Sequence, residues 1–333
     1  MKKILLSFVA FVFATVCLAQ QQLVATLTHG EEISMFYGAY AYRDAMEAAV
    51  DGDVINLSGG GFQACNIDKA VSIRGAGVEA EMPTFIINDF DINVPAESTN
   101  RLSIEGVNFP NRITLRNTLT NAYFLKNYMA DVWGSDNANI KNAMFVNCQV
   151  YYYHVNQSNE TVSSQFVNSY VSDIHTEENS NATAAYVNCV IKPHNFGERA
   201  SYIANSLLLN CILINQYPGG NQLSLPATTS AMNCLAINAN GSAENAYRDI
   251  AAGINNKYIQ DFAIFTDSDY MKDLTDEAKA TYLGSDGTPV GMFGGPLPFS
   301  FTPTYPQITK MNVASKTTAD GKLSVDIEVS AVQ

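Results

Sequence analysis

An asparagine interrupts a short apolar run about every 21 residues in the middle of this chain, with successive spacings of 21, 20, 22 and 23. Extending the pattern upstream finds another asparagine 20 residues earlier, and Gly106 a further 21 residues before it. The asparagines of this ladder are Asn127, Asn147, Asn168, Asn188, Asn210 and Asn233. A period of this length is typical of a stack of equivalent supersecondary units, each of which packs on its neighbours.

The composition of the repeats favours strands over helices. The apolar runs are rich in Val, Ile, Tyr and Phe and are bounded by Asn, Ser, Thr and Gly, which is strand composition with turn residues between strands. Three short strands and three bends fit into about 21 residues, and each strand then pairs in parallel with its copy one coil away, at about 4.8 Å. The sequence therefore predicts an all-β protein, a single-stranded parallel β-helix of about nine to ten coils.

The asparagine suits the bend at which each coil turns. Asn tolerates left-handed backbone better than other non-glycine residues, and Gly106 tolerates it because it has no Cβ. The side-chain amide can also bond to the same amide one coil above and below. We therefore expect the ladder to be structural rather than a row of surface ligands.

Four of the five cysteines beyond the N-terminal segment directly follow a ladder asparagine, and Ser169 takes that position in the remaining repeat. Equivalent positions in a stack face the same way, so we expect a column of small, buried, reduced side chains. A Cys189–Cys211 disulfide stays open as an alternative, because stacked neighbours lie within disulfide reach.

The first 19 residues have the pattern of a signal peptide: two lysines, an apolar stretch from 4 to 16, and small residues before Gln20. We expect cleavage there and export to the periplasm, outer surface or medium. A lipid anchor at Cys17 is disfavoured because bulky Val16 precedes it. No later stretch is long and apolar enough to span a bilayer.

The formal net charge is −13, and removal of Lys2 and Lys3 lowers it to −15 (−13 − 2). An acidic exported protein is a poor partner for nucleic acid, because phosphate contacts need a basic face. It also repels polyanionic sugars unless a cation bridges the charges.

Both ends of the stack carry segments that could cover it. An amphipathic helix is predicted over residues 42–50, as a lid on the first coil. Beyond a proline-rich stretch, segments 308–314 and 323–329 read as a hairpin with one apolar face, which could cover the last coil or dock a partner; we favour the cover. The predicted divisions are 1–19 signal peptide, 20–51 N-terminal segment and capping helix, 52–295 parallel β-helix, and 296–333 linker and C-terminal β-hairpin.

The run from Tyr42 to Gly77 resembles the opening of right-handed parallel β-helix proteins of the pectin-lyase-like fold. In these, a capping helix precedes segments like Gly52-Asp53-Val54-Ile55-Asn56-Leu57 and Val71-Ser72-Ile73-Arg74-Gly75. Tyr282 to Gly295 is similar to the closing segment of many secreted bacterial members. The resemblance covers about residues 37–296 and implies right-handed coils. It does not imply one activity, because the family includes lyases, hydrolases, esterases and adhesins.

Counting from the ladder gathers aromatic and histidine residues six and seven positions later, at the bend after the third strand. Three interpretations stay open: aromatic faces that contact sugar rings, a metal or acid–base site built on His154, His175 and Asp173, and rings that pack on each other. The candidate ligand-binding residues are Trp133, Tyr152, Tyr153, His154, Asp173, His175, Lys192, His194 and Tyr217.

No catalytic residue can be carried over from the family. Pectate lyases hold Ca²⁺ with clustered acids beside a basic residue, and no arginine or lysine aligns here with a column of acids. Nor does any histidine pair have the spacing of a metal motif. We expect no metal or cofactor, with Ca²⁺ only if the protein is a lyase. The sequence predicts a non-catalytic exported protein that contacts polysaccharide or cell-surface glycan. The alternatives are a polysaccharide lyase or glycoside hydrolase, and a structural or adhesive surface protein.

Overall fold

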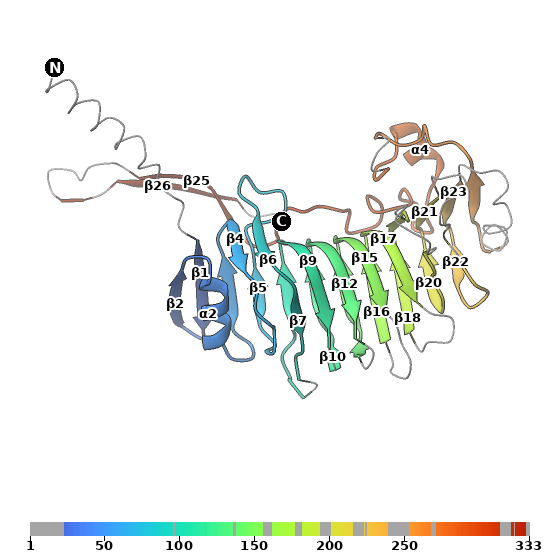
Figure 1. The fold of residues 1–333 in the computed structure, drawn as a ribbon. Coiled ribbons are helices and arrows are strands. Elements are labelled where there is room, and N and C mark those ends of the chain that lie inside the picture. The colour runs from blue at the N-terminus through green and yellow to red at the C-terminus, as the bar shows by residue number, and fades with distance from the viewer. Residues whose placement is uncertain are drawn as a thin grey trace, which may run out of the picture.

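The computed structural model describes residues 23–95, 97–116, 118–135, 138–155, 162–176, 182–193, 201–215, 223, 225–238, 253–267, 271–313, 321–322 and 324–330. The strands of successive coils stack in parallel register, which confirms the predicted right-handed parallel β-helix (Figure 1). Two long sheets run the length of the stack, and the core lies between them.

The first sheet begins with an antiparallel hairpin and continues as parallel strands. Its order is β2 (Glu32–Tyr37), β1 (Val24–His29), β3 (Val54–Leu57), β5 (Ser72–Arg74), β8 (Ser103–Glu105), β11 (Tyr123–Leu125), β14 (Ala143–Val146), β16 (Val162–Val167), β18 (Ala182–Val187), β20 (Ser206–Leu209) and β22 (Ser230–Met232).

The second sheet is parallel throughout. Its strands are β4 (Gly60–Gln63), β6 (Thr84–Ile87), β9 (Val107–Leu115), β12 (Tyr128–Gly134), β15 (Gln149–Val155), β17 (Tyr170–Thr176), β19 (Val190–Ile191), β21 (Ile212–Asn215), β23 (Leu235–Asn238) and β24 (Lys257–Ile259), with β7 (Phe90–Ile92) also paired to β9. A short parallel pair, β10 (Thr118–Thr120) and β13 (Asn139–Lys141), makes a further side of two coils.

The core is a continuous stack of equivalent side chains. Phe124, Phe145, Phe166 and Tyr186 lie in one column, with ring centroids 4.8, 4.6 and 5.0 Å apart and nearly parallel planes. All four are at most 1% exposed. Because parallel register repeats the same position in every coil, an aromatic residue placed inward once is packed by its own copies above and below.

The ladder lies at the bend between the two sheets, and its backbone is left-handed as expected. The φ angles are 70° at Gly106, 55° at Lys126, 51° at Asn147, 46° at Asn168, 51° at Asn188, 54° at Asn210 and 51° at Asn233. The prediction for Asn127 is therefore wrong, because Leu125 pairs with Val146 and this register puts Lys126 opposite Asn147.

Asn127 instead belongs to the neighbouring inward column, with Cys148. It is fully buried, its Nδ2 donates to the Ile104 carbonyl at 2.8 Å, and its Oδ1 accepts from the Val107 N–H at 2.9 Å. The amide thus satisfies the backbone of the preceding coil.

The cysteine column is buried as predicted, with Ser169 in the position between Cys148 and Cys189. Cys148 Sγ donates to the Phe124 carbonyl at 3.3 Å, and Ser169 Oγ donates to the Phe145 carbonyl at 3.2 Å. Cys189 and Cys211 repeat the contact one and two coils further on. The cysteines of the described residues are free thiols, and burial raises the pKa of the Cys148 thiol to about 12.

A C-terminal segment, residues 282–305, runs back along the ladder; we call it the strap. Asn168 Nδ2 donates to the carbonyls of Met292 and Gly294, at 2.9 and 2.6 Å. Asn210 Oδ1 accepts from the Ser285 N–H at 2.9 Å. Within the described ranges, no ladder amide bonds to another ladder amide, so the expected amide-to-amide chain is wrong. The strap supplies partners to Asn147, Asn168 and Asn210 instead.

The strap ends at the N-terminal half of the stack. Lys126 Nζ donates to the Thr302 carbonyl, and the Glu105 carboxylate accepts from the N–H and hydroxyl of Thr304, at 2.5 and 2.8 Å. Tyr305 then lies under the Arg74 guanidinium, at 5.7 Å.

The hairpin of β25 (Gln307–Val313) and β26 (Val325–Ser330) follows Tyr305 and lies toward the N-terminal end in Figure 1. The favoured placement over the last coil is therefore wrong, because the strap carries the chain back along the stack before the hairpin begins.

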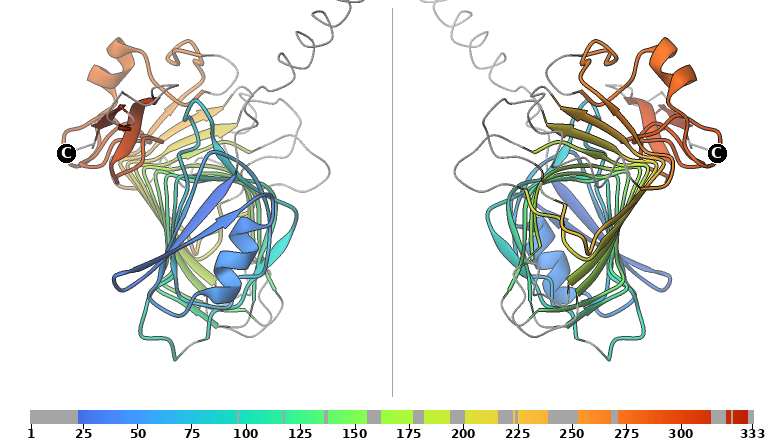
Figure 2. Two further views of the ribbon diagram at one scale, coloured as in Figure 1. Left: turned by 90° about the vertical axis from the view of Figure 1, so that its left-hand side faces the viewer. Right: turned by 90° about the vertical axis from the view of Figure 1, so that its right-hand side faces the viewer.

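The N-terminal end of the stack is covered by a helix, and the last coils are covered on one side. Helix α2 (Ala41–Ala48) buries Ala41, Tyr42, Ala45 and Met46 against the first coil, which confirms the predicted lid (Figure 2, left). Near the C-terminal end, Phe265, Met271, Leu274 and Ala278 pack on the outer faces of Val190, Ile212 and Leu235, along the side of the last coils.

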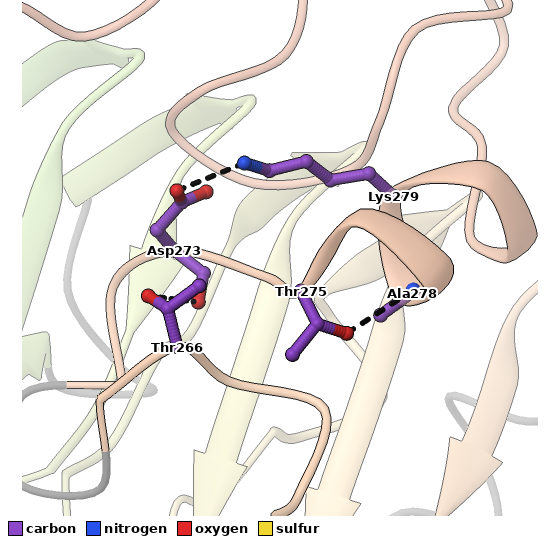
Figure 3. Close-up of polar contacts among 5 residues, drawn as sticks. All are labelled: Thr266, Asp273, Thr275, Ala278 and Lys279. Atoms are coloured by element: carbon purple, nitrogen blue, oxygen red, sulfur yellow. Dashed lines mark hydrogen bonds and ion pairs between the residues drawn. The ribbon is translucent and has the colours of Figure 1, made fainter.

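Helix α4 (Asp276–Thr281) belongs to this cluster on the side of the last coils. Its first turn is capped by Thr275, whose hydroxyl accepts from the Ala278 N–H at 3.3 Å (Figure 3). Lys279 pairs with Asp273 at 2.9 Å, and Thr266 bonds to the Asp273 carbonyl, which ties the helix to the loop before it.

Candidate functional site

The outer face of the second sheet carries a band of polar and aromatic side chains across β7, β9, β12, β15 and β17; we call it the polar strip. Its central column is Asp91, Thr114, Trp133, His154 and His175, each opposite the next in parallel register. Beside it lie Asp89, Arg112, Arg116, Asp131, Tyr152 and Asp173.

Trp133 and His154 share one column, although the sequence count placed them in neighbouring ones. That count started from Asn127 in the Trp133 coil. The true ladder position in that coil is Lys126, and Trp133 follows it by seven residues. His154 follows Asn147 by the same seven residues.

The rings of the central column stack on one another. The Trp133 and His154 centroids are 4.9 Å apart with planes 18° apart, and those of His154 and His175 are 4.7 Å and 22° apart. From the β9 side, the Arg112 guanidinium lies 4.4 Å from the Trp133 ring centre. Ring faces are thus covered by neighbours, and the indole N–H edge of Trp133 is buried beside Asp131. This geometry favours the packing interpretation over aromatic faces that stack on sugars.

Tyr153 does not lie on this surface. It is 1% exposed, in the inward column of Val132 and Ile174, and its hydroxyl lies 2.6 Å from Ser164 Oγ. Alternation along the strand explains the error: if His154 points outward, Tyr153 must point inward. Burial raises the pKa of Tyr153 to about 12.

Asp173 and Lys192 are both buried, at 7% and 5% exposure. Asp173 pairs with Tyr152 across the strands and accepts a hydrogen bond from the Ser201 hydroxyl at 3.3 Å. The pKa of Tyr152 is raised by burial and by the Asp173 charge. Lys192 follows β19, where its backbone bonds to Val171 and Ser172. His194 and Tyr217 lie outside the described residues.

The candidate residues predicted from the sequence do not include two arginines of the strip, Arg112 and Arg116. Arg112 Nε donates to Asp131 Oδ2 at 2.9 Å, and the Arg112 N–H donates to Asp89 Oδ1 at 3.0 Å. Arg116 Nε donates to Asp91 Oδ2 at 2.8 Å. Each acid belongs to the coil before or after its arginine, so the pairs become visible only once the register is known.

Asp131 is a carboxylate of the strip whose pKa is changed by its surroundings. Burial raises the pKa of Asp131 above its ordinary value, and the Arg112 guanidinium opposes that rise. The carboxyl group is therefore held partly desolvated next to one cation, an environment that suits either a hydrogen-bond acceptor or an acid.

Within the parts of the chain that the structure describes, no group of three or more His, Cys, Asp or Glu side chains could hold a metal ion. None of the helices described there is long and apolar enough to cross a membrane. Comparisons with models of known protein families, with curated proteins and with solved structures found no match to this chain.

Proposed function

We propose that this is an exported parallel β-helix protein, of the pectin-lyase-like kind, that binds glycans without cleaving them. The observation that carries the proposal is the polar strip. It places arginine, aspartate, tyrosine and histidine side chains in register on a rigid surface, at strand spacings of about 4.8 Å. A polymer with regularly repeated hydroxyl groups is the ligand class that such a row of donors and acceptors suits.

The contact would use ring edges and planar polar groups rather than ring faces. Trp133 and His154 cover each other's faces, and the Trp133 Nε1 atom is buried, so the role of this ring pair is to hold the surface rigid. Rigid, prearranged polar groups lose little conformational entropy on binding, which compensates for the absence of sugar stacking.

Affinity electrophoresis through gels that contain single polysaccharides tests this proposal. We expect at least one polymer to retard the protein, with affinity about tenfold weaker in Tyr152→Ala and in His154→Ala. The matched control is Tyr37→Ala, because Tyr37 is 53% exposed on β2, away from the strip. The proposal would be contradicted if no gel that contains a plant, host or microbial polysaccharide retarded the protein.

A glycoside hydrolase is the second candidate, and Asp131 and Asp173 favour it. They lie on strands two spacings apart with Tyr152 between them, so about 9.6 Å separates their backbones. Inverting glycosidases hold their carboxyl groups about 6.5–9.5 Å apart and raise the pKa of the acid. Release of reducing ends from a polysaccharide, abolished in Asp131→Asn and in Asp173→Asn, would make this the better assignment. Unsaturated ends released only with added Ca²⁺ would favour a lyase instead.

A purely adhesive role is the remaining alternative, with the β25–β26 hairpin as the docking part. Removal of residues 307–333 would then abolish attachment to the cell surface and leave glycan retardation unchanged.

A further inference from the structure

Arg112 and Arg116 use only part of their hydrogen-bonding capacity inside the protein. Each binds an aspartate through Nε, and their side chains remain 46% and 49% exposed. Within the described residues, the terminal Nη groups of both arginines make no hydrogen bond. A guanidinium is a planar fork whose outer N–H groups can bind two adjacent acceptors at once.

The two arginines flank Thr114, with Arg112 within β9 and Arg116 directly after it, so their outer N–H groups lie on the same row of the strip. Arg112 is held from three sides, by Asp131, by the Asp89 contact to its backbone, and by the Trp133 ring. Asp91 fixes Arg116 from the preceding coil. Ordering the forks in this way before a ligand arrives lowers the entropy lost on binding.

The charge around this row is unfavourable for an anion. Asp91 and Asp131 neutralise the two arginines at 2.8 and 2.9 Å, and Asp89 adds another negative charge beside Arg112. The whole chain carries a formal net charge of −13. A carboxylated or sulfated polymer would therefore bring its charges against paired aspartates and an acidic protein.

A neutral sugar meets no such repulsion. Its neighbouring hydroxyls can accept from the arginine forks and donate to the free lone pairs of the Asp91 carboxylate, which is an acceptor only and is 32% exposed. We infer that Arg112 and Arg116 determine ligand class in the polar strip, and that the ligand is a neutral polysaccharide with adjacent free hydroxyls. This inference rests on the proposed glycan-binding function and adds two residues and a charge class to it.

Affinity electrophoresis with matched neutral and acidic polymers tests the inference. The neutral set is a β-glucan, a β-galactan, a mannan and dextran; the acidic set is polygalacturonate and a sulfated galactan. We expect retardation by a neutral polymer that changes less than twofold between 0.05 and 0.5 M NaCl, because hydrogen bonds to an uncharged ligand are little screened. Retardation by the acidic polymers alone, lost at high salt, would overturn the neutral class while keeping glycan binding.

Substitution of the arginines tests their role. Arg112→Gln and Arg116→Gln are each expected to weaken binding about tenfold, and Arg112→Lys and Arg116→Lys should not restore it, because lysine keeps the charge and loses the fork. The matched control is Arg43→Gln, since Arg43 pairs with Asp44 and lies 4.4 Å over the Tyr40 ring at the capping helix. Unchanged binding in both glutamine variants, or full rescue by lysine, would overturn the inference.

Two readouts keep this inference separate from the proposed function. Far-UV circular dichroism and the melting temperature of each variant show whether the solenoid is intact, so that a binding loss is assigned to the strip only when both match the unsubstituted protein. If no polymer retards the unsubstituted protein, the proposed glycan-binding function itself is contradicted. Retardation by acidic polymers alone, or retardation that does not change in the arginine variants, contradicts only the inference.

Discussion

The ladder and the polar strip are both columns of polar side chains repeated from coil to coil, on different parts of the same solenoid. They differ in where their partners come from. The protein itself supplies partners for the ladder, through the backbone of the strap. The strip arginines are only partly satisfied by aspartates of adjacent coils. Repetition alone therefore does not indicate a binding surface; exposed hydrogen-bonding capacity left over after folding does.

Removal of a ladder side chain that bonds to the strap should have the largest effect on stability. Asn168→Ala loses two hydrogen bonds to the strap and leaves alanine at φ 46°. We expect the free energy of unfolding to fall by about 2–3 kcal/mol, from about 1 kcal/mol per bond and the strain of left-handed alanine. Denaturant unfolding followed by circular dichroism measures the change.

Asn142→Ala is the control for Asn168→Ala, because Asn142 has φ 55° but is exposed and bonds only to side chains outside the strap. It should cost about 1 kcal/mol, from backbone strain. Equal losses in the two variants would mean that the strap does not stabilise the ladder.

The strap anchor at Glu105 is expected to have the next largest effect. Glu105→Ala removes the acceptor of the Thr304 N–H and hydroxyl and leaves Lys126 without the carboxylate next to it. The loss should be about 2 kcal/mol. Hydrogen exchange should speed up in residues 298–306 but not in β14. Exchange that speeds up equally in both would indicate loss of the whole fold rather than release of the strap.

The repeat was sufficient to predict the fold, because period and strand composition leave one architecture that buries every apolar run. The strap could not be predicted in the same way. It has no repeat of its own, and its contact with Asn168 spans 124 residues in sequence. Hydrogen bonds at that separation leave no local pattern.

The site was only partly predictable, because coil length varies. Asp89 and Arg112 are 23 residues apart, whereas Arg112 and Asp131 are 19 apart. A constant offset of about 21 residues misses both pairs. The aromatic column was found because its rings are rare in this chain. The sequence count assigned Tyr153 to the wrong side, because a count from the ladder carries no information on which way alternate residues of a strand point.

Tyr152 lies on the strip and Tyr153 lies in the interior, so removal of each hydroxyl tests one of the two regions. Tyr153→Phe removes the buried contact to Ser164 and should lower the free energy of unfolding by about 1 kcal/mol without changing glycan retardation. Tyr152→Phe should weaken retardation a few-fold and leave stability within about 0.5 kcal/mol. Paired unfolding and electrophoresis measure both. If Tyr153→Phe weakened retardation and Tyr152→Phe lowered stability instead, the binding surface would lie elsewhere.

A pH series probes a polar contact that belongs to neither region, and its effect should be the smallest. His29 Nδ1 lies 2.7 Å from Asp53 Oδ1, and this hydrogen bond, with the Asp53 and Glu32 charges, raises the pKa of His29. A raised histidine pKa means that the folded state favours the charged ring. The stabilisation is therefore complete below the ordinary pKa of about 6.5 and is lost as pH rises through the raised value.

The expected result is a melting temperature that falls slightly as pH rises past the raised pKa of His29, with the fall absent in His29→Gln. His29 is mostly exposed, so solvent screens the contact and the shift should be small. The ladder amides do not titrate at all, and hence Asn168→Ala should keep the same pH dependence as the unsubstituted protein. A pH-dependent fall that survives in His29→Gln would instead assign the titration to other groups, with the imidazoles of the polar strip as the first to examine by NMR.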